Sequence, residues 1–435
     1  MAREYISIIL FVGDDIPCLE QCLCHILDST EAGQCELIIV EKTHNIAMHE
    51  YLCLLPNILL IDYDVNRTAG MQCALAAQAA TGEKILFMQD VVWVRENWLS
   101  YICGMLEEHP SAGVVQVLEK SEICDESFTC QEALKITGGC FLIDRLLLQS
   151  LGGLLPDYET MSYCFFDLSA RLLKNTRKII DISNKFFYFN NLVFLEVNVQ
   201  QFEADCLTYS NFNGFSFGYS SAVRDDMLSL IDYKRSQIKI LEIGCACGGT
   251  LLRIKNENPL AEVYGIEICE PAAEIAKNFA EVLTADLESL ERVDFIAKFD
   301  YIVMGDVLEH LFNTDAVLQK VRSWLNQKGK LVVSVPNISH ISVVMSLLSG
   351  QWEYKDAGIL DRTHVRFFTV DSIQRCLQRN GFQADLLCSK GVDVNNQTAS
   401  MFKALKEELL QMKTVCVKKE NLEPYQIICV ASKGI

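Results

Sequence analysis

Apolar runs alternate with amphipathic segments along the first half of the chain. Five runs are apolar and short enough to be strands, at residues 5–12, 35–42, 58–64, 84–90 and 112–120. Segments of helical length lie between them, such as AGMQCALAAQAATG and ENWLSYICGMLEEHP. Because continuous apolar strands separated by helices are typical of a parallel sheet covered on both faces, this pattern predicts an α/β domain.

The same alternation begins again in the second half. The predicted strands are KILEIG (239–244), VYGIEI (263–268), VLTAD (282–286), FDYIVMGD (299–306) and LVVSVPN (331–337), followed by FQADLLCSK and QIICVASK. A long insertion near residues 391–425 joins the last two. Seven strands with intervening helices predict a complete doubly wound sheet, so the chain is expected to be an α/β protein with two doubly wound sheets in tandem.

The pattern divides the chain into two domains and a connector. We expect the first domain at residues 1–190, the connector at 191–232 and the second domain at 233–435. Aromatic residues crowd the region from Phe186 to Tyr219. They are expected to form either an interdomain core or a lid over a ligand of the second domain.

Composition and charge narrow the function classes. Of the 435 residues, 50% are hydrophobic and 22% are charged, which is typical of a globular protein. The net charge of −19 argues against nucleic acid or an anionic membrane surface as the main partner. No run approaches the roughly 20 apolar residues of a transmembrane helix, and MAREYISIILFVGDD is typical of a buried strand rather than a signal peptide. These features predict a cytoplasmic protein.

The 19 cysteines indicate neither disulfides nor zinc. Most lie inside apolar runs, where a reduced cysteine behaves as a small hydrophobic residue. The cluster Cys18, Cys22 and Cys24 lacks a second CxxC or a nearby histidine pair, so we expect core packing there.

A small-residue turn marks the candidate ligand site of the second half. LEIGCACGGT (241–250) follows a predicted strand and opens a helix. A turn that brings backbone N–H groups close to a ligand requires small side chains, and Gly244, Ala246 and Gly248 meet that need. The run also fits GxAxxG, so a dinucleotide is an alternative ligand.

Acidic residues at successive strand ends favour a different ligand. Glu242, two residues before the turn, would repel a pyrophosphate and suit a ligand with an ammonium or sulfonium group. S-adenosylmethionine carries both. Glu267 is placed to accept hydrogen bonds from ribose hydroxyls, and Asp286 from the adenine amino group. Asp306 follows the fourth strand at the same edge, where open α/β sheets bind ligands.

Residues from about 220 to 390 resemble a class I S-adenosylmethionine-dependent methyltransferase. The blocks GDVLEHL, SVPNISH and GILDRTHVRFFT resemble a bacterial branch of that superfamily associated with cell-surface glycan gene products. The chain departs from the usual GxGxG by carrying Cys245, Ala246 and Cys247, whose cysteine side chains can point away from the ligand. The resemblance implies binding of S-adenosylmethionine through Glu242, Gly244, Gly248, Glu267 and Asp286.

Methyl transfer to a hydroxyl requires a base at the same sheet edge. His364 in LDRTHVRFF is the favoured base, with Asp361 orienting it or holding the loop. The alternative is that DRTH caps the following helix and fixes the loop by hydrogen bonds. His310, which ends GDVLEH, is expected to be structural or to line the acceptor site, and His340 to cap a helix. No Asp/His set resembles the magnesium site of catechol-type methyltransferases, so no catalytic metal is expected.

The first 190 residues resemble the GT-A fold of family-2 glycosyltransferases. The similarity lies in the opening strand, in CLEQCLCHILDS, in TAGMQCALAAQAATGEKILFMQD and in ITGGCFLIDRLLLQSLGGL. Sugar-nucleotide transfer needs a carboxylate pair that holds a divalent ion, but only Asp90 stands in that stretch. Glu41, in the uracil-binding position, is followed by Lys42, and Cys164 and Phe165 stand where the family has its base. The sequence therefore predicts a degenerate sugar-nucleotide site.

These features together predict a methyltransferase that modifies an oxygen of a sugar or surface-glycan precursor, either a small molecule or carrier-linked. The glycosyltransferase-like domain is expected to bind or position this acceptor, or to form a homodimer. Two alternatives remain open at this point. One is a bifunctional protein in which both domains are active, and the other is a non-catalytic scaffold that only binds ligands.

Overall fold

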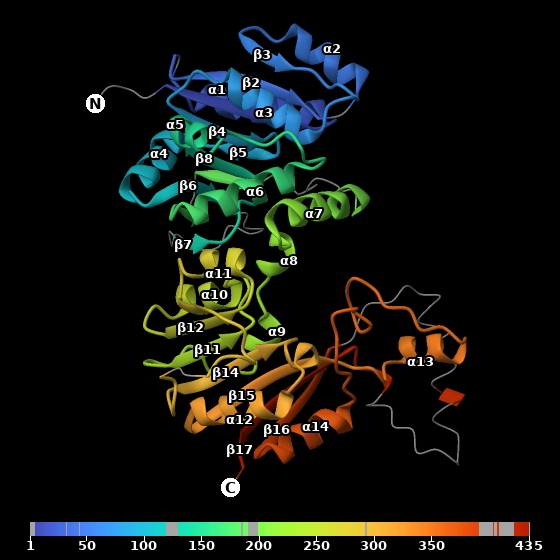
Figure 1. The fold of residues 1–435 in the computed structure, drawn as a ribbon. Coiled ribbons are helices and arrows are strands. Elements are labelled where there is room, and N and C mark those ends of the chain that lie inside the picture. The colour runs from blue at the N-terminus through green and yellow to red at the C-terminus, as the bar shows by residue number, and fades with distance from the viewer. Residues whose placement is uncertain are drawn as a thin grey trace. The chain divides into compact units, whose positions relative to one another are not determined.

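The computed structural model shows two compact units, residues 1–221 and 222–435. It describes residues 5–31, 33–42, 44–118, 129–183, 186–189, 199–291, 294–390 and 422–434, together with 403, 407 and 408. The predicted insertion near 391–425 lies almost wholly outside the described residues. Each unit contains a large sheet with helices, coloured from blue to green in the first unit and from yellow-green to red in the second (Figure 1).

The first unit alternates helices and strands. Its elements are β1 Ile6–Val12, α1 Ile16–Asp28, β2 Cys35–Glu41, α2 Ile46–Leu54, β3 Ile58–Ile61, α3 Ala69–Ala79, β4 Lys84–Gln89, β5 Val92–Val94, α4 Trp98–Glu108, β6 Ala112–Val117, β7 Thr129–Ala133, β8 Cys140–Asp144, α5 Arg145–Ser150, α6 Met161–Lys174, β9 Lys178–Ser183, β10 Phe187–Phe189, α7 Val199–Asn213 and α8 Phe217–Ser220. All five strands expected from the apolar runs are present, as β1, β2, β3, β4 and β6.

The sheet of the first unit is mixed, which corrects the expectation of a parallel, doubly wound sheet. Its order is β3-β2-β1-β4-β8-β6-β9-β7, and β5 pairs with β10 in a separate ribbon. Strands β3, β2, β1 and β4 are parallel, but β8 runs antiparallel to both β4 and β6, and β7 runs antiparallel to β9. The apolar pattern could not predict this, because a short buried strand has the same composition in either direction.

Phe165 belongs to the core of the first unit and not to a ligand-facing surface. Its ring packs edge-on against Phe141, Phe87 and Phe11, with centroid distances of 4.9, 5.9 and 6.3 Å. The neighbouring Cys164 is also buried in α6. Two side chains at the position where the sequence comparison placed a catalytic base are therefore packing residues.

The aromatic segment packs within the first unit in its described part. Tyr209 of α7 contacts Phe215 and Phe217, and Tyr163 of α6 contacts Phe202 and Tyr209. The division between units at residues 221 and 222 falls inside the expected connector, so α7 and α8 extend the first unit beyond residue 190. Residues 191–198 lie outside the described part.

The second unit contains a complete seven-stranded sheet. Its elements are α9 Asp225–Leu228, β11 Lys239–Ile243, α10 Gly249–Glu257, β12 Glu262–Glu267, α11 Glu270–Ala276, β13 Glu281–Thr284, β14 Phe299–Gly305, the 3-10 turn η1 Leu308–His310, α12 Thr314–Trp324, β15 Leu325–Pro336, α13 Ile341–Leu348, α14 Val370–Arg379, β16 Phe382–Lys390 and β17 Gln426–Lys433. The order is β13-β12-β11-β14-β15-β17-β16, with only β17 antiparallel to its neighbours.

Helices cover both faces of this second sheet (Figure 1). Ile240 of β11 joins a cluster with α9 and α10 residues, whereas Leu241 joins a cluster that includes α12 and α14 residues. Because successive strand residues point to opposite faces, two buried faces require the continuous apolar runs seen in the sequence. The prediction of a doubly wound, Rossmann-like sheet is confirmed for this unit.

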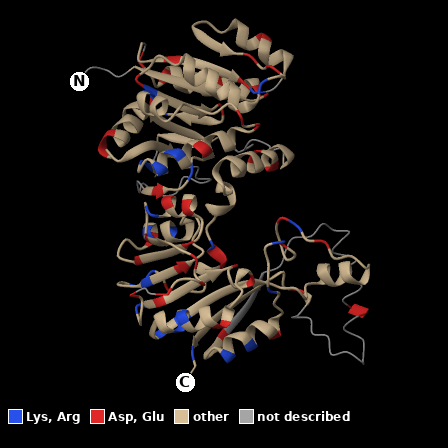
Figure 2. Cartoon of the chain, viewed as in Figure 1, with Lys and Arg blue, Asp and Glu red and all other residues tan. Residues whose placement is uncertain are grey.

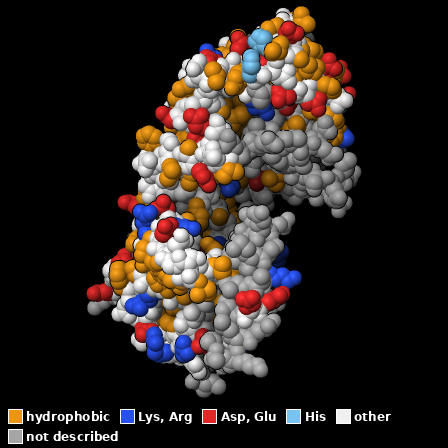
Figure 3. Space-filling model, turned by 90° about the vertical axis from the view of Figure 1, so that its right-hand side faces the viewer, with side chains coloured by type: hydrophobic (Ala, Val, Ile, Leu, Met, Phe, Trp, Pro, Cys, Tyr) orange, Lys and Arg blue, Asp and Glu red, His pale blue; other side chains and the backbone are white. Residues whose placement is uncertain are grey.

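Charged and apolar side chains are interspersed on the surface of both units. Acidic residues occur throughout the two units, in keeping with the net charge of −19 (Figure 2). Apolar side chains on the face shown in Figure 3 are scattered among polar ones. Among the described residues, no helix has the length and apolar character needed to cross a membrane. The described cysteines are free thiols; Cys18 and Cys22 are buried as expected, whereas Cys24 is exposed, so core packing is wrong for that residue.

Candidate functional site

The central strands of the second sheet define the place for a ligand. The chain leaves β11 for β12 on one side, and it later returns to β14 on the other side. In such sheets the connections diverge at this point and leave a crevice outside the carboxyl ends of the strands. The turn after β11 and the 3-10 turn η1 after β14 both lie at this edge.

The turn after β11 needs small residues for conformational and steric reasons. Gly244, Ala246 and Gly248 all have positive φ angles, of 72°, 48° and 81°. A Cβ on Gly244 would lie 2.9 Å from Cγ2 of Val307, and one on Gly248 would lie 3.0 Å from Cβ of Ala276. The sequence therefore keeps the turn close against η1 and α11, with α10 beginning at Gly249.

The two cysteines of the turn point into the protein. Cys245 and Cys247 are buried, and Sγ of Cys245 packs against Gly265 of β12. The expectation that these side chains can face away from a ligand is consistent with this packing. The alanine is accommodated in the left-handed conformation, so the departure from GxGxG leaves the turn intact.

Glu242 is a buried carboxylate with an unpartnered oxygen. Its side chain is 5% exposed, and Oε2 has no hydrogen-bond partner among the described residues. Burial raises the pKa of Glu242 to about 8, while the hydroxyl of Thr250 and the charge of Arg224 act in the opposite direction. A carboxylate in this state gains most from a cationic ligand, because the ligand would supply the missing counter-charge.

Glu267 fixes the turn from the neighbouring strand. Its carboxylate accepts hydrogen bonds from the N–H of Ala246 and the N–H of Cys269, each over 2.8 Å. These contacts hold the end of β12 against the turn after β11. Because each carboxylate oxygen has a further lone pair, Glu267 can also accept hydrogen bonds from a ligand hydroxyl.

Asp286 and Asp306 have different surroundings at the same edge. Asp286 is exposed and accepts a hydrogen bond from the N–H of Glu288 over 2.9 Å. Asp306 is bound by the Arg224 guanidinium at 3.0 Å and accepts a bond from Ser334 over 3.0 Å. The structure thus engages Asp306 in an internal ion pair, which the sequence did not predict, whereas Asp286 remains accessible.

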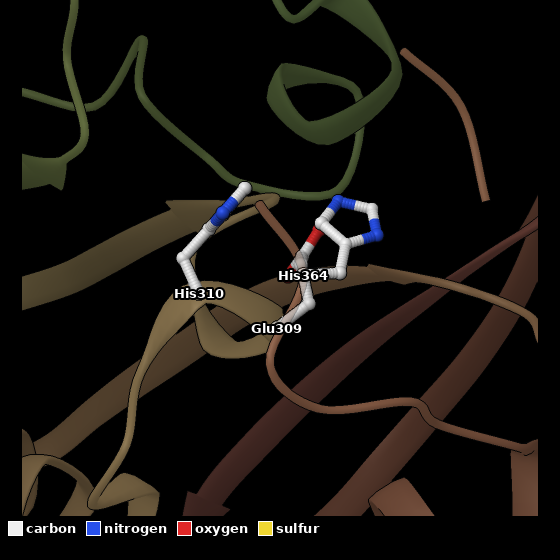
Figure 4. A group of neighbouring side chains, drawn as sticks. All are labelled: Glu309, His310 and His364. Atoms are coloured by element: carbon white, nitrogen blue, oxygen red, sulfur yellow. The ribbon is translucent and has the colours of Figure 1, made fainter. Parts of the chain in front are cut away.

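Three metal-ligating side chains meet beside this edge. Glu309, His310 and His364 each offer one ligand atom within 4.8 Å of the others. The rings of His310 and His364 have centroids 4.8 Å apart. All three side chains project from the same side of the ribbon (Figure 4). Glu309 is 1% exposed, and neither of its carboxylate oxygens has a hydrogen-bond partner among the described residues.

The loop that carries His364 is held against η1 by the backbone. The N–H groups of Val365 and Arg366 donate to the carbonyl of Glu309 over 2.9 and 3.0 Å. The guanidinium of Arg366 donates to the carbonyls of Leu311, over 2.9 Å, and Phe312. Segments that are more than 50 residues apart in sequence therefore present their side chains together.

The contacts in this loop distinguish between the roles expected for Asp361 and for DRTH. Nδ1 of His364 bonds to the carbonyl of Ile359 over 3.0 Å, whereas Asp361 accepts bonds from the N–H and the hydroxyl of Thr363. Asp361 therefore holds the loop rather than orienting the ring directly. Helix α14 is capped by Thr369, so the expectation that DRTH caps it is wrong, whereas the hydrogen bonds from Thr363 to Asp361 do fix the loop. His340 does cap α13.

Glu309 was missed by the sequence analysis although it stands beside His310 in VLEH. The sequence feature that could have indicated Glu309 is a Glu-His pair directly after a strand that ends at the ligand edge of the sheet. The histidine alone was a candidate, because an acidic residue next to a strand end is common on protein surfaces. Its burial without partners became visible only in the structure.

A second acidic site lies at the corresponding edge of the first unit. Asp90, after β4, accepts a hydrogen bond from the N–H of Gly13 over 2.8 Å. Burial raises the pKa of Asp90, while Lys42 lowers it through its charge. Glu41 is bound by Nδ1 of His49 at 2.9 Å. The two carboxylates have separate partners. Glu41, His49 and Asp62 bring their potential metal-ligand atoms close together, and Asp90 is not a member of this group.

Comparison with known families identifies the second unit. Residues 218–387 match the model of a family described as a methyltransferase domain. The second unit is a class I S-adenosylmethionine-dependent methyltransferase domain. S-adenosylmethionine is the methyl donor that such a domain uses, and the orphaned Glu242 below the turn fits a cationic ligand of this kind.

Curated proteins resemble parts of the chain. The mitochondrial ubiquinone biosynthesis O-methyltransferase of Bos taurus is 27% identical over 176 residues, which cover 37% of this chain and 46% of that protein. The hybrid PKS-NRPS synthetase LUC5 of Fusarium sp. is 25% identical over 300 residues, covering 66% of this chain and 7% of that protein. The chain thus spans less than half the length of either relative.

Solved structures similar to the methyltransferase domain come from several microbes. A methyltransferase from Bacillus halodurans has a TM-score of 0.34 and 13% identity, over 48% of this chain and 98% of that one. An S-adenosylmethionine-dependent methyltransferase from Archaeoglobus fulgidus has a TM-score of 0.34 and 16% identity, over 52% and 99%.

Because burial raises the pKa of Glu242, we expect the free energy of unfolding of the wild type and of Glu242→Gln to depend differently on pH. Below about pH 4.5 the folded and unfolded chains both hold the proton, and between pH 4.5 and about 8 only the folded chain holds it. Burial of Glu242 therefore costs more stability as pH rises. Without cofactor, Glu242→Gln should be more stable than the wild type by a margin that grows to about 2–5 kcal/mol at pH 8.

Urea unfolding at several pH values measures the difference in free energy of unfolding between Glu242→Gln and the wild type. Hydrogen exchange in peptides from residues 239–257 then shows whether the difference arises around Glu242. The exposed Glu281→Gln at the start of β13 is the matched control and should show no pH-dependent difference. A margin for Glu242→Gln that stays constant between pH 5 and pH 8 would contradict the assigned pKa.

Proposed function

We propose that the protein transfers a methyl group from S-adenosylmethionine to an oxygen of a sugar or surface-glycan precursor. The observation that carries the cofactor half of this proposal is the unpartnered, buried carboxylate of Glu242 under a turn of small residues. The family match supports the same cofactor. The acceptor half rests on the resemblance of the GDVLEHL, SVPNISH and GILDRTHVRFFT blocks to glycan-associated methyltransferases.

Different residues at the sheet edge would bind different chemical groups of S-adenosylmethionine. Glu242 would pair with the ammonium group of the donor, and the N–H groups of the turn would approach its main chain. Glu267 would accept the ribose hydroxyls, and Asp286 is accessible to the adenine amino group. Asp306, which is already paired with Arg224, would shape this site rather than bind the donor directly. Bound S-adenosylmethionine supplies a methyl carbon activated by its sulfonium.

The acceptor hydroxyl must lose its proton as the methyl group is transferred. Glu309, His310 and His364 provide the group of titratable side chains beside the donor site. Burial and the neighbouring His364 lower the pKa of His310, so its ring is neutral near pH 7 and able to accept a proton or a metal ion. An oxygen acceptor also accords with the name of the bovine O-methyltransferase that this chain resembles in part.

The first unit would bind the acceptor instead of transferring a sugar. Gly13 and Asp90 follow adjacent strands β1 and β4, at the divergence point where such sheets bind ligands. The charge of Lys42 acts on Asp90 and would oppose binding of a divalent cation there. These contacts support a site that has kept its position in the fold and lost its metal chemistry.

Calorimetric titration of the full chain with S-adenosylmethionine tests the donor assignment. Glu242→Gln should bind at least about tenfold more weakly, because the ammonium group would lose a buried counter-charge. Glu281→Gln should bind like the wild type. Equal affinities for all three proteins, or tighter binding of NAD than of S-adenosylmethionine, would refute the assignment.

Acceptor identity is tested with methyl-labelled donor and a cell-envelope extract. Label should enter a glycan fraction with the wild type and fall at least about tenfold with Glu242→Gln. Donor binding without labelled product in any fraction would favour the scaffold alternative. Label in protein or lipid fractions alone would contradict the sugar acceptor while leaving the cofactor assignment intact.

Sugar-nucleotide hydrolysis tests the first unit. Because Asp90 lacks a second carboxylate and is influenced by Lys42, UDP- and GDP-sugars with Mn²⁺ should be hydrolysed no faster than in the protein-free blank. The measurement is nucleotide release, with Asp90→Asn as the comparison. Metal-dependent release by the wild type that disappears in Asp90→Asn would establish the bifunctional alternative.

A further inference from the structure

We propose that Glu309, His310 and His364 bind a divalent transition-metal ion that holds the acceptor oxygen. This inference rests on the proposed function, because it assigns a role to side chains beside the donor site. It replaces the expectation of a metal-free site. The cluster combines one carboxylate oxygen and two imidazole nitrogens within 4.8 Å of one another.

The burial of Glu309 is the observation that points to a ligand. A carboxylate that is 1% exposed and has neither oxygen hydrogen-bonded among the described residues is costly to keep in the folded protein. A bound cation would supply the missing partner for both oxygens.

The histidines are oriented as metal ligands commonly are. Nδ1 of His364 bonds to the carbonyl of Ile359 at 3.0 Å, and Nδ1 of His310 lies 3.3 Å from the carbonyl of Thr363. A backbone carbonyl at Nδ1 fixes that nitrogen as the N–H donor and leaves Nε2 with its lone pair. In both rings, Nε2 is therefore the nitrogen that is free to bind a metal ion.

The backbone holds the ligands before a metal arrives. Glu309 and His310 lie on the same 3-10 turn, and two N–H groups next to His364 donate to the carbonyl of Glu309. The ligand atoms, which lie within 4.8 Å of one another, would move closer together to reach metal–ligand distances of about 2.0–2.2 Å. Figure 4 shows the three side chains extending from these two backbone segments.

The ligand set favours Zn²⁺, Co²⁺, Mn²⁺ or Fe²⁺ over Mg²⁺ or Ca²⁺. Imidazole nitrogen suits first-row transition metals, whereas Mg²⁺ and Ca²⁺ prefer oxygen ligands. Two histidines and one carboxylate leave coordination positions open, as catalytic metal sites do. An acceptor hydroxyl, or two neighbouring hydroxyls of a sugar, can occupy those positions.

The metal would make the acceptor hydroxyl easier to deprotonate. A hydroxyl bound to the ion has a lowered pKa and releases its proton to water. The resulting oxygen forms a bond to the methyl carbon while the carbon–sulfur bond breaks and its electron pair stays on sulfur. The products are the methylated acceptor, S-adenosylhomocysteine and one proton. His364 is then a metal ligand rather than the general base.

Titration of the chelator-treated full chain with Co²⁺ tests the site directly. The wild type should bind one equivalent with the visible absorption of nitrogen and oxygen ligation, and Zn²⁺ should displace it whereas Mg²⁺ should not. Glu309→Gln and His364→Asn should each weaken Co²⁺ binding at least about tenfold. Metal content after dialysis gives a second readout that does not depend on activity.

Two histidine variants serve as matched controls. His340→Asn keeps a side chain suited to capping α13 and should bind Co²⁺ like the wild type. His49→Asn alters the other group of ligand atoms, Glu41, His49 and Asp62, and should also leave binding unchanged. Calorimetry with S-adenosylmethionine checks that the donor site is folded in Glu309→Gln and His364→Asn.

The outcomes separate this inference from the proposed function. Binding of S-adenosylmethionine without uptake of Co²⁺ or Zn²⁺ would overturn the metal site and leave the donor assignment standing. Loss of Co²⁺ only in His49→Asn, equal binding in Glu309→Gln, or sulfur-to-cobalt absorption from thiolate ligands would also overturn it. Failure of the wild type to bind S-adenosylmethionine would instead count against the proposed function.

Discussion

Buried carboxylates with oxygen atoms that lack hydrogen-bond partners are the constraint on which the rest of the second unit's site depends. Glu242 and Glu309 lie at the carboxyl edge of the second sheet, and each has side-chain oxygen that no described group satisfies. Burial raises the pKa of both residues. Such groups lower the stability of the empty protein and become favourable only when a cation arrives. Two of them at one edge indicate a site organised around positive charge.

The surrounding backbone makes this arrangement possible. The small-residue turn after β11 is locked to β12 by Glu267, and the loop around His364 is locked to η1 through the carbonyl of Glu309. Arg224 links the two regions, because its charge acts on Glu242 and Glu309 while its guanidinium binds Asp306. The site is therefore built before any ligand binds, which lowers the cost of ordering it.

The two units both carry acidic residues after central parallel strands, but the surroundings of these residues differ. In each, the ligand edge lies where the connections diverge from a central parallel strand. In the first unit, Asp90 accepts a hydrogen bond from a backbone N–H, and the charge of Lys42 lowers its pKa against the effect of burial. In the second unit, Asp306 is paired with Arg224, whereas Glu242 and Glu309 have buried oxygen atoms without a hydrogen-bond partner among the described residues.

The sequence predicted most of the second fold and part of its site. Buried strands such as β11 and β17 are recognisable because two covered faces demand unbroken apolar runs, and the turn at Gly244 because its backbone excludes large side chains. The direction of β8 was not predictable from an apolar run alone. The pairing of Asp306 with Arg224 and the isolation of Glu309 depend on contacts across 50 or more residues, which local patterns do not encode.

Counting the protons released when S-adenosylmethionine binds tests the central claim most directly. Calorimetry at pH 7 in buffers of different ionisation enthalpy gives this number. If Glu242 is protonated in the empty protein and ionised beside the bound ammonium group, the wild type should release close to one proton and Glu242→Gln close to none. Equal proton release by the two proteins would contradict the account.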